Sequence, residues 1–447
     1  MSSSPIPSVD AKATQDALAS ITAAIPSKLS HFTLENGLSV YLREDRSTPI
    51  VAVQLWYHVG TSHEPPGHTN LSHLLEHLLF EGSSKLPAGQ YSRVIALLGG
   101  KANATTHDDA TAFDILLPAN RLPMALEIMA DAMSSATLDQ AQFEHEIKSI
   151  EDERRLKYEN STYFQHLDRH EALAYAGSPY GEPTFGHALD LSEMQWASVH
   201  AWYRTWYVPN NATLVVVGAT DLPALRRQVE AHFAAIPRGP LPEKATLRFS
   251  GEMRERSQVL EDESPQEAVH LSFNVPSQAS ASSVHITFAL RLLIELLGEG
   301  FSSRFYSRLV RDQRLLTYIQ ISYEHLHRGD TLLTVSALCN KDLATPQQAA
   351  QAIWEQIDEL RGSPLPEQEL ESAKLRLLTK QLYNSSKHEL QAEGIGQTAA
   401  AGLDPMLIDL GAKIIRDLTV TTVQQVAIEY LRRERLTITC IQQGEAA

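Results

Sequence analysis

Two histidines and a glutamate lie close together in the segment His73-Leu-Leu-Glu76-His77. On a helix, positions i, i+3 and i+4 share one face, so the two imidazoles and the carboxylate converge. Two imidazoles at i and i+4 can bind one zinc ion, and zinc lowers the pKa of its bound water to about 7. Glu76 is then placed to take a proton from that water and to pass it to a leaving amine. The spacing predicts a hydrolase that uses one Zn2+ per chain.

A catalytic zinc site needs three protein ligands and one open position, so another part of the chain must supply the third ligand. The acidic segment 144–155 is the richest source, because it contains Glu144, Glu146, Glu151 and Glu153. Glu146 and Glu153 are seven residues apart and share one face of a helix. An acidic helix is also typical of a solvated surface with ion pairs between turns. The pattern alone therefore leaves all four carboxylates open.

The motif must lie on a helix for this chemistry to work. Leu71–Phe80 is predicted to be that helix, with Thr69 or Asn70 as its cap and Gly82 at its end. The residues between the polar positions are mostly leucines, so the opposite face is expected to pack into the core.

Strands and helices alternate through the rest of the first half. A hairpin is predicted around Asn36-Gly37 in the segment 32–42. A capping box of Thr137 and Gln140 is predicted to open a long helix that ends near residue 158. The other predicted strands are 51–58, 102–106, 111–117 and 213–217, and the other predicted helices are 91–98, 123–133, 191–207 and 223–233.

The segment Pro237–Pro242 divides the chain nearly in half, because its three prolines cannot continue a helix or a central strand. Two stretches recur across it at nearly equal offsets. Residues 207–217 resemble residues 430–440, which are 223 positions further on, and residues 78–84 resemble residues 296–303, which are about 218 positions further on. These matches predict a duplicated unit of roughly 220 residues.

The two copies are not predicted to be equivalent. An offset of 218 places Arg291, Ile294 and Glu295 at the positions of the zinc motif, so the second copy cannot bind zinc. We expect an α+β fold of two homologous units with antiparallel sheets flanked by helices. The expected divisions are an N-terminal extension (1–30), a zinc-bearing domain (31–236), a proline-rich linker (237–247) and a homologous domain without zinc (248–447).

Composition excludes several classes of protein. The chain has 38 basic and 54 acidic residues, a formal charge of −16, and no basic block, which argues against a nucleic-acid partner. No run of about 18 apolar residues predicts a membrane span. The two cysteines, Cys339 and Cys440, build no disulfide framework and leave the redox compartment open. The start lacks an intact signal peptide, so the chain is expected to be cytoplasmic as written, or periplasmic if a signal was removed.

The inverted order His73-x-x-Glu76-His77 and the duplicated halves resemble the pitrilysin, insulysin and mitochondrial processing peptidase family. The resemblance covers residues 31 to about 443. It implies that the third ligand is Glu153, which follows His77 by 76 residues in Glu151-Asp-Glu153-Arg-Arg. It also implies that Glu146, seven residues earlier, supports the site.

The resemblance implies how substrate is held. The segment Gly99-Gly-Lys-Ala-Asn-Ala-Thr-Thr106 matches an edge strand that takes the substrate as an added strand, with Asn103, Ala104 and Thr105 in contact with it. In the second half, Arg311 and Tyr318 match a pair that anchors the substrate and stabilises the oxyanion.

Family members with four such units form a closed chamber, whereas this chain has two. We therefore expect a second two-unit chain, in a homodimer or in a heterodimer with a related subunit that carries the Arg–Tyr pair. The expected function is a zinc endopeptidase that hydrolyses peptides or unfolded segments in a dimeric chamber. Two alternatives are a non-catalytic core subunit of a larger complex and a maturation protease for one dedicated peptide. A non-catalytic subunit has no reason to keep His73, Glu76, His77 and Glu153.

Overall fold

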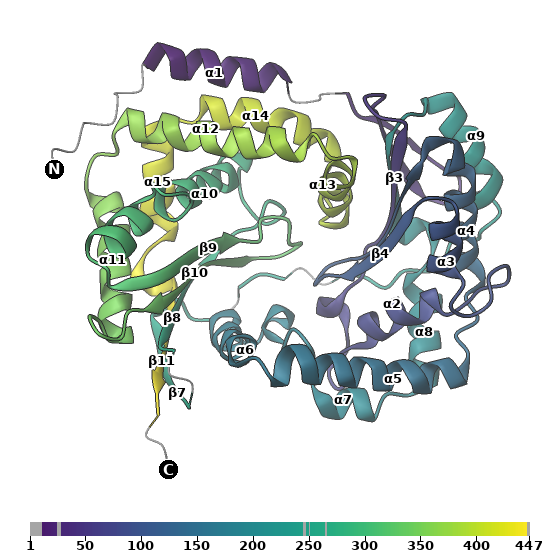
Figure 1. The fold of residues 1–447 in the computed structure, drawn as a ribbon, viewed down its shortest axis with the longest axis horizontal. Coiled ribbons are helices and arrows are strands. Elements are labelled where there is room, and N and C mark those ends of the chain that lie inside the picture. Colours follow the sequence, from purple (N-terminus) through teal and green to yellow (C-terminus); the bar gives the residue numbers. More distant parts are fainter. Residues whose placement is uncertain (1–10, 25–27, 245–246, 250, 264–265, 445–447) are drawn as a thin grey trace.

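Two β-sheets organise the chain, one in each half of the sequence (Figure 1). The computed structural model describes residues 11–24, 28–244, 247–249, 251–263 and 266–444. The first sheet has the order β1-β2-β6-β3-β5-β4. Its strands are β1 (Ser30–Thr33), β2 (Ser39–Glu44), β3 (Ile50–Tyr57), β4 (Lys101–Thr106), β5 (Thr111–Pro118) and β6 (Ala212–Gly218). The predicted hairpin is confirmed as the antiparallel pair β1–β2.

The second sheet repeats this arrangement in the order β7-β11-β8-β10-β9. Its strands are β7 (Arg256–Asp262), β8 (Ala268–Val275), β9 (Leu316–Tyr323), β10 (Thr331–Cys339) and β11 (Leu436–Gln443). One expectation needs correction, because each sheet contains a parallel pair, β2–β6 or β7–β11, among its antiparallel neighbours. Parallel neighbours need a long crossover connection. In both pairs, one strand comes from the start of a half of the sequence and the other from its end. The edge strand β9 takes the place of β4.

Helices cover one face of the first sheet and bury its apolar core. They are α2 (Leu71–Phe80), α3 (Tyr91–Leu97), α4 (Leu122–Ser135), α5 (Gln140–Arg154), α7 (Ala188–Ser192), α8 (Trp196–Trp206) and α9 (Leu222–Phe233). The helix predicted at 191–207 is wrong in its start, because the chain breaks between α7 and α8. The predicted capping box is also wrong. Asp139 caps α5, and its side chain accepts hydrogen bonds from the amides of Ala141 and Gln142.

The second half has its own apolar core under a similar set of helices. They are α10 (Val284–Leu297), α11 (Pro346–Gly362), α12 (Glu367–Asn384), α14 (Ile408–Asp417) and α15 (Val420–Tyr430). The segment predicted as an N-terminal extension contains α1 (Ala11–Ala24), which packs on α12 and buries Leu18 in this core (Figure 1). This part of the extension therefore belongs to the second half, and residues 1–10 lie outside the described residues.

Each half lends one helix to the sheet of the other. Helix α6 (Thr162–Tyr175), which the sequence did not predict, packs on β8 and β11. There His170 bonds to the hydroxyls of Thr439 (2.8 Å) and Ser272 (2.6 Å). Helix α13 (His388–Ala400) packs on β3 and β6, where a Cβ at Gly396 would meet the indole of Trp56 at 2.1 Å. Only glycine allows α13 to approach Trp56 this closely. With α6 on the second sheet and α13 on the first, the two halves pack through exchanged helices.

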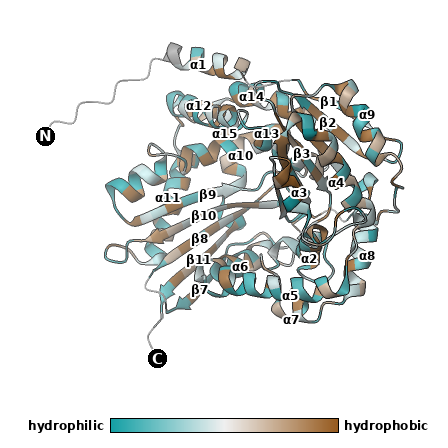
Figure 2. Ribbon diagram, turned by 45° about the vertical axis from the view of Figure 1, so that its right-hand side comes forward, coloured by the Kyte–Doolittle hydropathy of each residue, from teal (hydrophilic) through white to brown (hydrophobic). Residues whose placement is uncertain are grey.

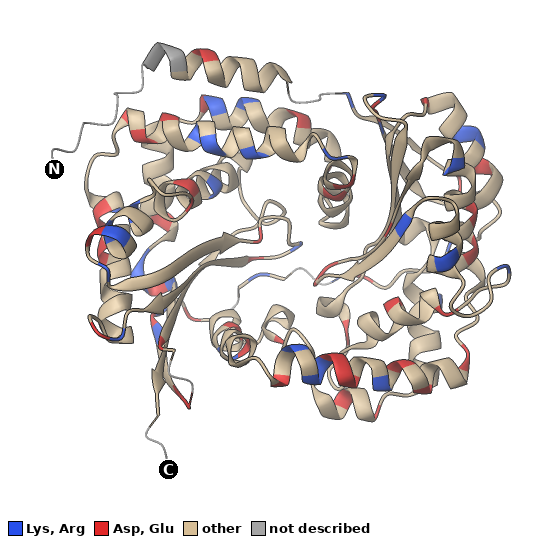
Figure 3. Ribbon diagram, viewed as in Figure 1, with Lys and Arg blue, Asp and Glu red and all other residues tan. Residues whose placement is uncertain are grey.

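Polarity follows this layering. Figure 2 shows hydrophobic colour concentrated on the strands, whereas α5 is mostly hydrophilic. Figure 3 shows the charged residues mainly on helices, with acidic and basic residues interspersed along α5. Among the described residues, no helix is long and apolar enough to cross a bilayer. Cys339 and Cys440 are both free and buried.

Candidate metal centre and active site

Helix α2 presents the predicted motif from a helix with one apolar face. Leu71–Phe80 is helical as predicted. Its buried apolar residues are Leu71, Leu74, Leu75, Leu78 and Leu79. His73, Glu76 and His77 are half-buried on the other face, where α5 packs against α2. Burial of the leucines therefore orients the three polar side chains toward α5.

The start of α2 differs from the prediction. Asn70 stands at the cap position with a left-handed backbone (φ 74°), but its side chain makes no capping bond. Instead the carboxylate of Glu64 accepts hydrogen bonds from the amides of Asn70 (3.0 Å) and Ser72 (2.6 Å). Burial raises the pKa of Glu64 to about 7, although these two bonds act in the opposite direction. Thr69 binds Asp190 instead, with 2.8 Å between its hydroxyl and that carboxylate.

Three potential ligand atoms converge between α2 and α5. The Oε2 of Glu153 lies 3.7 Å from the Nε2 of His73 and 3.8 Å from the Nε2 of His77. All three ligand atoms lie within 4.8 Å of one another. A tetrahedral zinc ion with bonds of about 2.1 Å separates its ligand atoms by roughly 3.4 Å, so small side-chain movements suffice. Two imidazole nitrogens and one carboxylate are also a donor set that zinc uses in catalytic sites. The residues fit a zinc ion.

Protonation favours ligation. Burial, with the neighbouring His77, lowers the pKa of His73 to about 4, so its imidazole is neutral at pH 7. Burial acts to raise the pKa of Glu153, but the hydrogen bond from Lys157 (2.6 Å) and the two histidines outweigh it and lower that pKa. Lone pairs are therefore available on both kinds of ligand.

Glu146 contacts one of the potential ligands, His77, on the ring nitrogen that points away from Glu153. This buried carboxylate lies 2.8 Å from the Nδ1 of His77 and 3.0 Å from the Nδ1 of His145. A carboxylate that accepts a hydrogen bond from Nδ1 requires the proton on that nitrogen, which leaves Nε2 of His77 with its lone pair toward Glu153. The other two candidates differ, since Glu144 is exposed and Glu151 lies outside the cluster of converging ligand atoms.

Glu76 stands beside the cluster without belonging to it. Its Oε2 accepts a hydrogen bond of 2.6 Å from the hydroxyl of Thr106, the last residue of β4. Burial raises the pKa of Glu76, and the hydrogen bond from Thr106 opposes that shift. A carboxylate held in this way can exchange a proton with a group bound at the metal position.

Strand β4 carries the three predicted substrate-contact residues. It pairs with β5 on one side only, so its other edge is open. Ala104, Thr105 and Thr106 line a pocket of about 300 Å3 together with His73, Glu76 and Glu153, while Asn103 lines a neighbouring cavity. The glycine before the strand, Gly99, has φ of +81°, which other residues rarely adopt. The open edge therefore runs beside the cluster.

Arg311 and Tyr318 lie elsewhere. Arg311 is the next-to-last residue of a π-helical segment (Tyr306–Asp312) and pairs with Asp312 at 2.8 Å. Tyr318 lies on β9, is half exposed, and donates a hydrogen bond of 2.6 Å to Gln320. Among the described residues, no hydrogen bond or ion pair joins either side chain to the ligand cluster. Tyr318 occupies the edge of the second sheet, as β4 does in the first.

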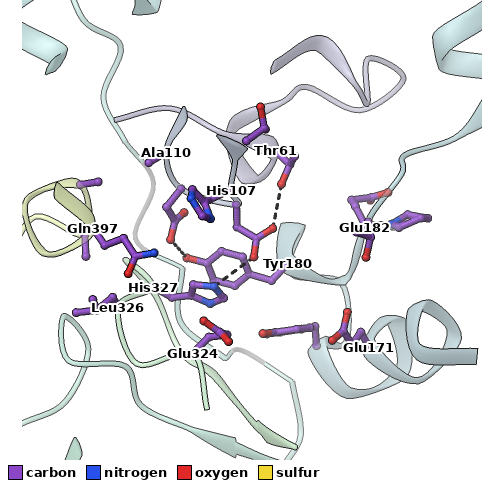
Figure 4. A pocket seen from close by; sticks show the side chains of 18 of the residues that line it. Thr61, His107, Ala110, Glu171, Tyr180, Glu182, Glu324, Leu326, His327 and Gln397 are labelled. Atoms are coloured by element: carbon purple, nitrogen blue, oxygen red, sulfur yellow. Dashed lines mark hydrogen bonds and ion pairs between the residues drawn. The ribbon is translucent and has the colours of Figure 1, made fainter. Parts of the chain in front are cut away.

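Sequence reasoning missed a second cavity that adjoins this pocket. It has a volume of about 450 Å3 and lies between the two halves, and both cavities include Thr61, Thr106 and Glu182 in their walls (Figure 4). The turn after β4 forms part of its wall and faces His327 of the second half. The consecutive acids at 108 and 109 were the one available signal, and their partners in the second half, His327 and Arg328, are more than 200 positions away.

Known proteins resemble the chain in both halves. The family model described as insulinase (peptidase family M16) matches residues 39–187, and the model described as the peptidase M16 inactive domain matches residues 194–377. The chain belongs to peptidase family M16. Within this family, the half matched by the inactive-domain model is the one in which Arg291, Ile294 and Glu295 replace the metal motif.

Individual M16 relatives agree with this assignment. The zinc protease PqqE of Helicobacter pylori is 28% identical over 416 residues, which cover 90% of this chain and 89% of that protein. The crystal structure of a protease from Helicobacter pylori superposes with a TM-score of 0.86 at 24% identity and covers 93% of this chain and 100% of that one. Pitrilysin gives a TM-score of 0.76 at 20% identity and covers 94% of this chain but 45% of its own. These two structures share the fold.

Proposed function

We propose that the chain is a zinc-dependent endopeptidase that hydrolyses peptides or unfolded segments. The observation that carries the proposal is the convergence of His73, His77 and Glu153, with Glu76 beside them and outside the ligand set. The similarity to proteins named zinc proteases supports it.

In this proposal each side chain has a distinct task. His73, His77 and Glu153 hold the ion, and Glu146 fixes the ring of His77 through its Nδ1. When bound, zinc lowers the pKa of a coordinated water to about 7 and polarises a peptide carbonyl. Glu76 accepts a proton from the attacking water and delivers it to the nitrogen of the leaving amine, so peptide and water become an acid and an amine. The hydroxyl of Thr106 orients Glu76 during both transfers.

The open edge of β4 explains why the substrate should be an extended chain. A peptide added beside Asn103, Ala104 and Thr105 would pair through main-chain hydrogen bonds and pass along the metal cluster. Such pairing demands little of the substrate sequence but requires an extended segment. A folded protein cannot present one.

A second two-half chain is the proposed partner. Two observations support it: this chain spans 45% of pitrilysin, and no described contact brings Arg311 or Tyr318 to the cluster. A homodimer, or a heterodimer with a related subunit, would bring such a pair to the substrate from the partner. Size-exclusion chromatography with light scattering at several protein concentrations tests this part, and a strictly monomeric active enzyme would refute it.

The activity is tested by Glu76→Gln. This variant should retain zinc and lose hydrolysis of an unstructured peptide by ~10²–10⁴-fold, because the proton acceptor is gone. His77→Ala should lose both zinc and activity. The matched control is Glu151→Gln, which removes a carboxylate of the same helix outside the cluster and should leave both unchanged. A zinc-loaded Glu76→Gln protein with near-normal turnover would refute the assignment.

A further inference from the structure

The turn that follows β4 is held by both halves of the molecule. Within the first half, the amide of Ser62 donates to the carbonyl of Asp108 (2.9 Å), and the amide of His107 donates to the carbonyl of Ala110 (2.8 Å). The hydroxyl of Thr61 donates to the carboxylate of Asp108 (3.0 Å). The turn begins one residue after the threonine that donates to the proposed general base.

The second half reaches this turn with one arginine, Arg328, from the connection between β9 and β10. Its amide and its Nε each donate to the carboxylate of Asp109 at 2.8 Å, and its Nη2 lies 3.2 Å from the carbonyl and the hydroxyl of Ser62. Tyr180 also donates to Asp109, at 2.7 Å. The side chains of Arg328 and Asp109 are only 12% and 7% exposed, so the pair is largely buried.

A second ion pair stands next to the first. The Nε2 of His327 lies 3.2 Å from Asp108, and its ring stacks on Tyr180 at 4.5 Å between centroids. Figure 4 shows Thr61, Tyr180 and His327 gathered around this turn. Burial alone would lower the pKa of His327, but the acidic partners outweigh it and raise that pKa to about 9. His327 is therefore protonated at neutral pH and can pair with Asp108 as a cation.

Stability alone does not account for this arrangement. Buried ion pairs are often no more stabilising than apolar residues of the same size, but they fix one geometry and reject others. Here the geometry fixed is that of a six-residue edge strand whose last hydroxyl contacts Glu76. An error of about 1 Å at such a position can cost up to ~10²-fold in rate.

We propose that Arg328 and His327 of the second half are positioning residues for Glu76, because they hold the turn after β4 and, through it, the hydroxyl of Thr106. The second half thus acts on proton transfer without touching the metal cluster. This inference rests on the proposed endopeptidase function. It makes catalysis depend on how the two halves of one chain are docked.

A double-mutant cycle tests the route through Thr106. Arg328→Met should lower kcat by ~10–100-fold and change KM much less. Zinc content should stay at one per chain, because the proposed ligands lie on α2 and α5. Thr106→Val should lower kcat similarly. In the Thr106→Val background, Arg328→Met should have less than about a twofold further effect, since coupled residues are not additive. Arg328→Lys should recover part of the loss, because an ammonium can still donate to Asp109.

Arg304→Met is the matched control for lost stability. Arg304 is also a buried arginine, and its guanidinium donates to both oxygens of Glu369 at 2.7 and 2.9 Å within the second half. Its loss should lower the melting temperature and leave kcat unchanged. If Arg328→Met does not fold, Asp108→Asn removes the charge partner of His327 at a half-exposed site and should lower kcat by a smaller factor that disappears in Thr106→Val.

Two outcomes overturn the inference. One is an unchanged kcat in Arg328→Met, and the other is full additivity of Arg328→Met with Thr106→Val. Failure of the proposed function would give a different result, because Glu76→Gln would then keep its activity. If only the inference of this section fails, Glu76→Gln is inactive and Arg328→Met is not coupled to Thr106→Val. The two failures are therefore distinguishable by the Glu76 variant alone.

Discussion

In the first half α2 contacts α5, and in the second half α10 contacts α12. Between α2 and α5 the facing groups are two imidazoles and carboxylates, with Lys157 as the cation that contacts Glu153. Donors of lone pairs converge there. The local charge is negative, and a divalent cation is the group that would balance it.

Between α10 and α12 the corresponding space is filled by acidic and basic side chains that form ion pairs with one another. Glu295 occupies the position of His77 after an offset of 218. Its carboxylate lies 2.8 Å from the Nζ of Lys380 and 3.4 Å from the Nε of Arg376, and it is 3% exposed. Lys380 also contacts Glu299 at 2.7 Å. The duplicated helix pair can thus hold either an ion or its own ion pairs, and the difference lies in a few side chains rather than in the fold.

The ligand carboxylate should give the largest effect. Glu153→Gln should lose zinc almost completely, because a neutral amide is a weak ligand, and activity should fall with it. Glu146→Gln removes the bond to Nδ1 of His77 and should weaken zinc binding by ~10–100-fold. Zinc titration against a chelator measures both. Equal zinc affinity in these variants and in Glu151→Gln would mean that α5 contributes no ligand.

The two edge strands give the next largest effect. Tyr318→Phe on β9 should lower kcat by ~10²-fold if its hydroxyl stabilises an oxyanion across a dimer interface. Steady-state kinetics of the chain alone measures this effect. A mixture with catalytically dead Glu76→Gln chains then shows whether the tyrosine acts on the partner's cluster. A silent Tyr318→Phe would restrict catalysis to the first sheet and its edge β4.

Breaking the ion pairs of the second half should change stability and spare the metal. Glu295→Gln leaves Lys380 and Arg376 with a weaker partner and should lower the free energy of unfolding by about 1–3 kcal/mol. Zinc content should remain one per chain. Urea unfolding and metal analysis of the same samples measure both. Loss of zinc in this variant would show that the two helix pairs are not independent.

The last expected effect, which is measured as stability rather than as metal content or activity, is a pH dependence at the contact between the halves. The pKa of His327 is about 9, against an ordinary value of 6.5, so its contribution is complete below pH 6.5 and is lost as pH rises through 9. The free energy of unfolding should fall by at most about 1.4 kcal/mol per pH unit in this window.

His327→Gln should flatten the slope of the free energy of unfolding against pH. Burial raises the pKa of Glu171 to about 8, so Glu171 titrates in the same range, and the difference between variant and wild type isolates the contribution of His327. The other charged or titratable groups that face the histidine are Asp108, Asp109, Glu324, His107 and His325. Urea unfolding of both proteins from pH 6 to 10 measures the slopes. Parallel slopes would remove His327 from the linkage.

The sequence predicted the elements whose faces are cleanly divided. Helix α2 has its predicted bounds because leucines fill one face and the three polar residues fill the other. Helix α6 was missed because it buries a polar face, with His166, Asp168 and His170 turned inward, so no apolar stripe marks it. The order of strands in the second sheet follows from the duplication. The contact of Arg328 with Asp109 has no local pattern, because the two residues are 219 positions apart.

The cap of α2 shows the same limit on a smaller scale. Thr69 and Asn70 are good capping residues by type, but Glu64 supplies the carboxylate from six residues upstream. The backbone at Asn70 is left-handed, and its side chain makes no capping bond. Residue preference predicts that a cap exists, whereas the path of the preceding loop decides which side chain provides it.

The exchange of α6 and α13 has a consequence for synthesis on the ribosome. The last strand of the first sheet ends at Gly218, but α13, which covers its second face, begins at His388. At ~5–20 residues per second, about 10–30 s separate the two. During this time the nascent chain exposes the surface around Trp56 that α13 later buries. The first half therefore completes its fold only when most of the second has been made. A chain cut between the halves would leave the first sheet with an uncovered apolar face around Trp56 and the second with uncovered polar groups, such as Ser272 and Thr439, that are otherwise buried.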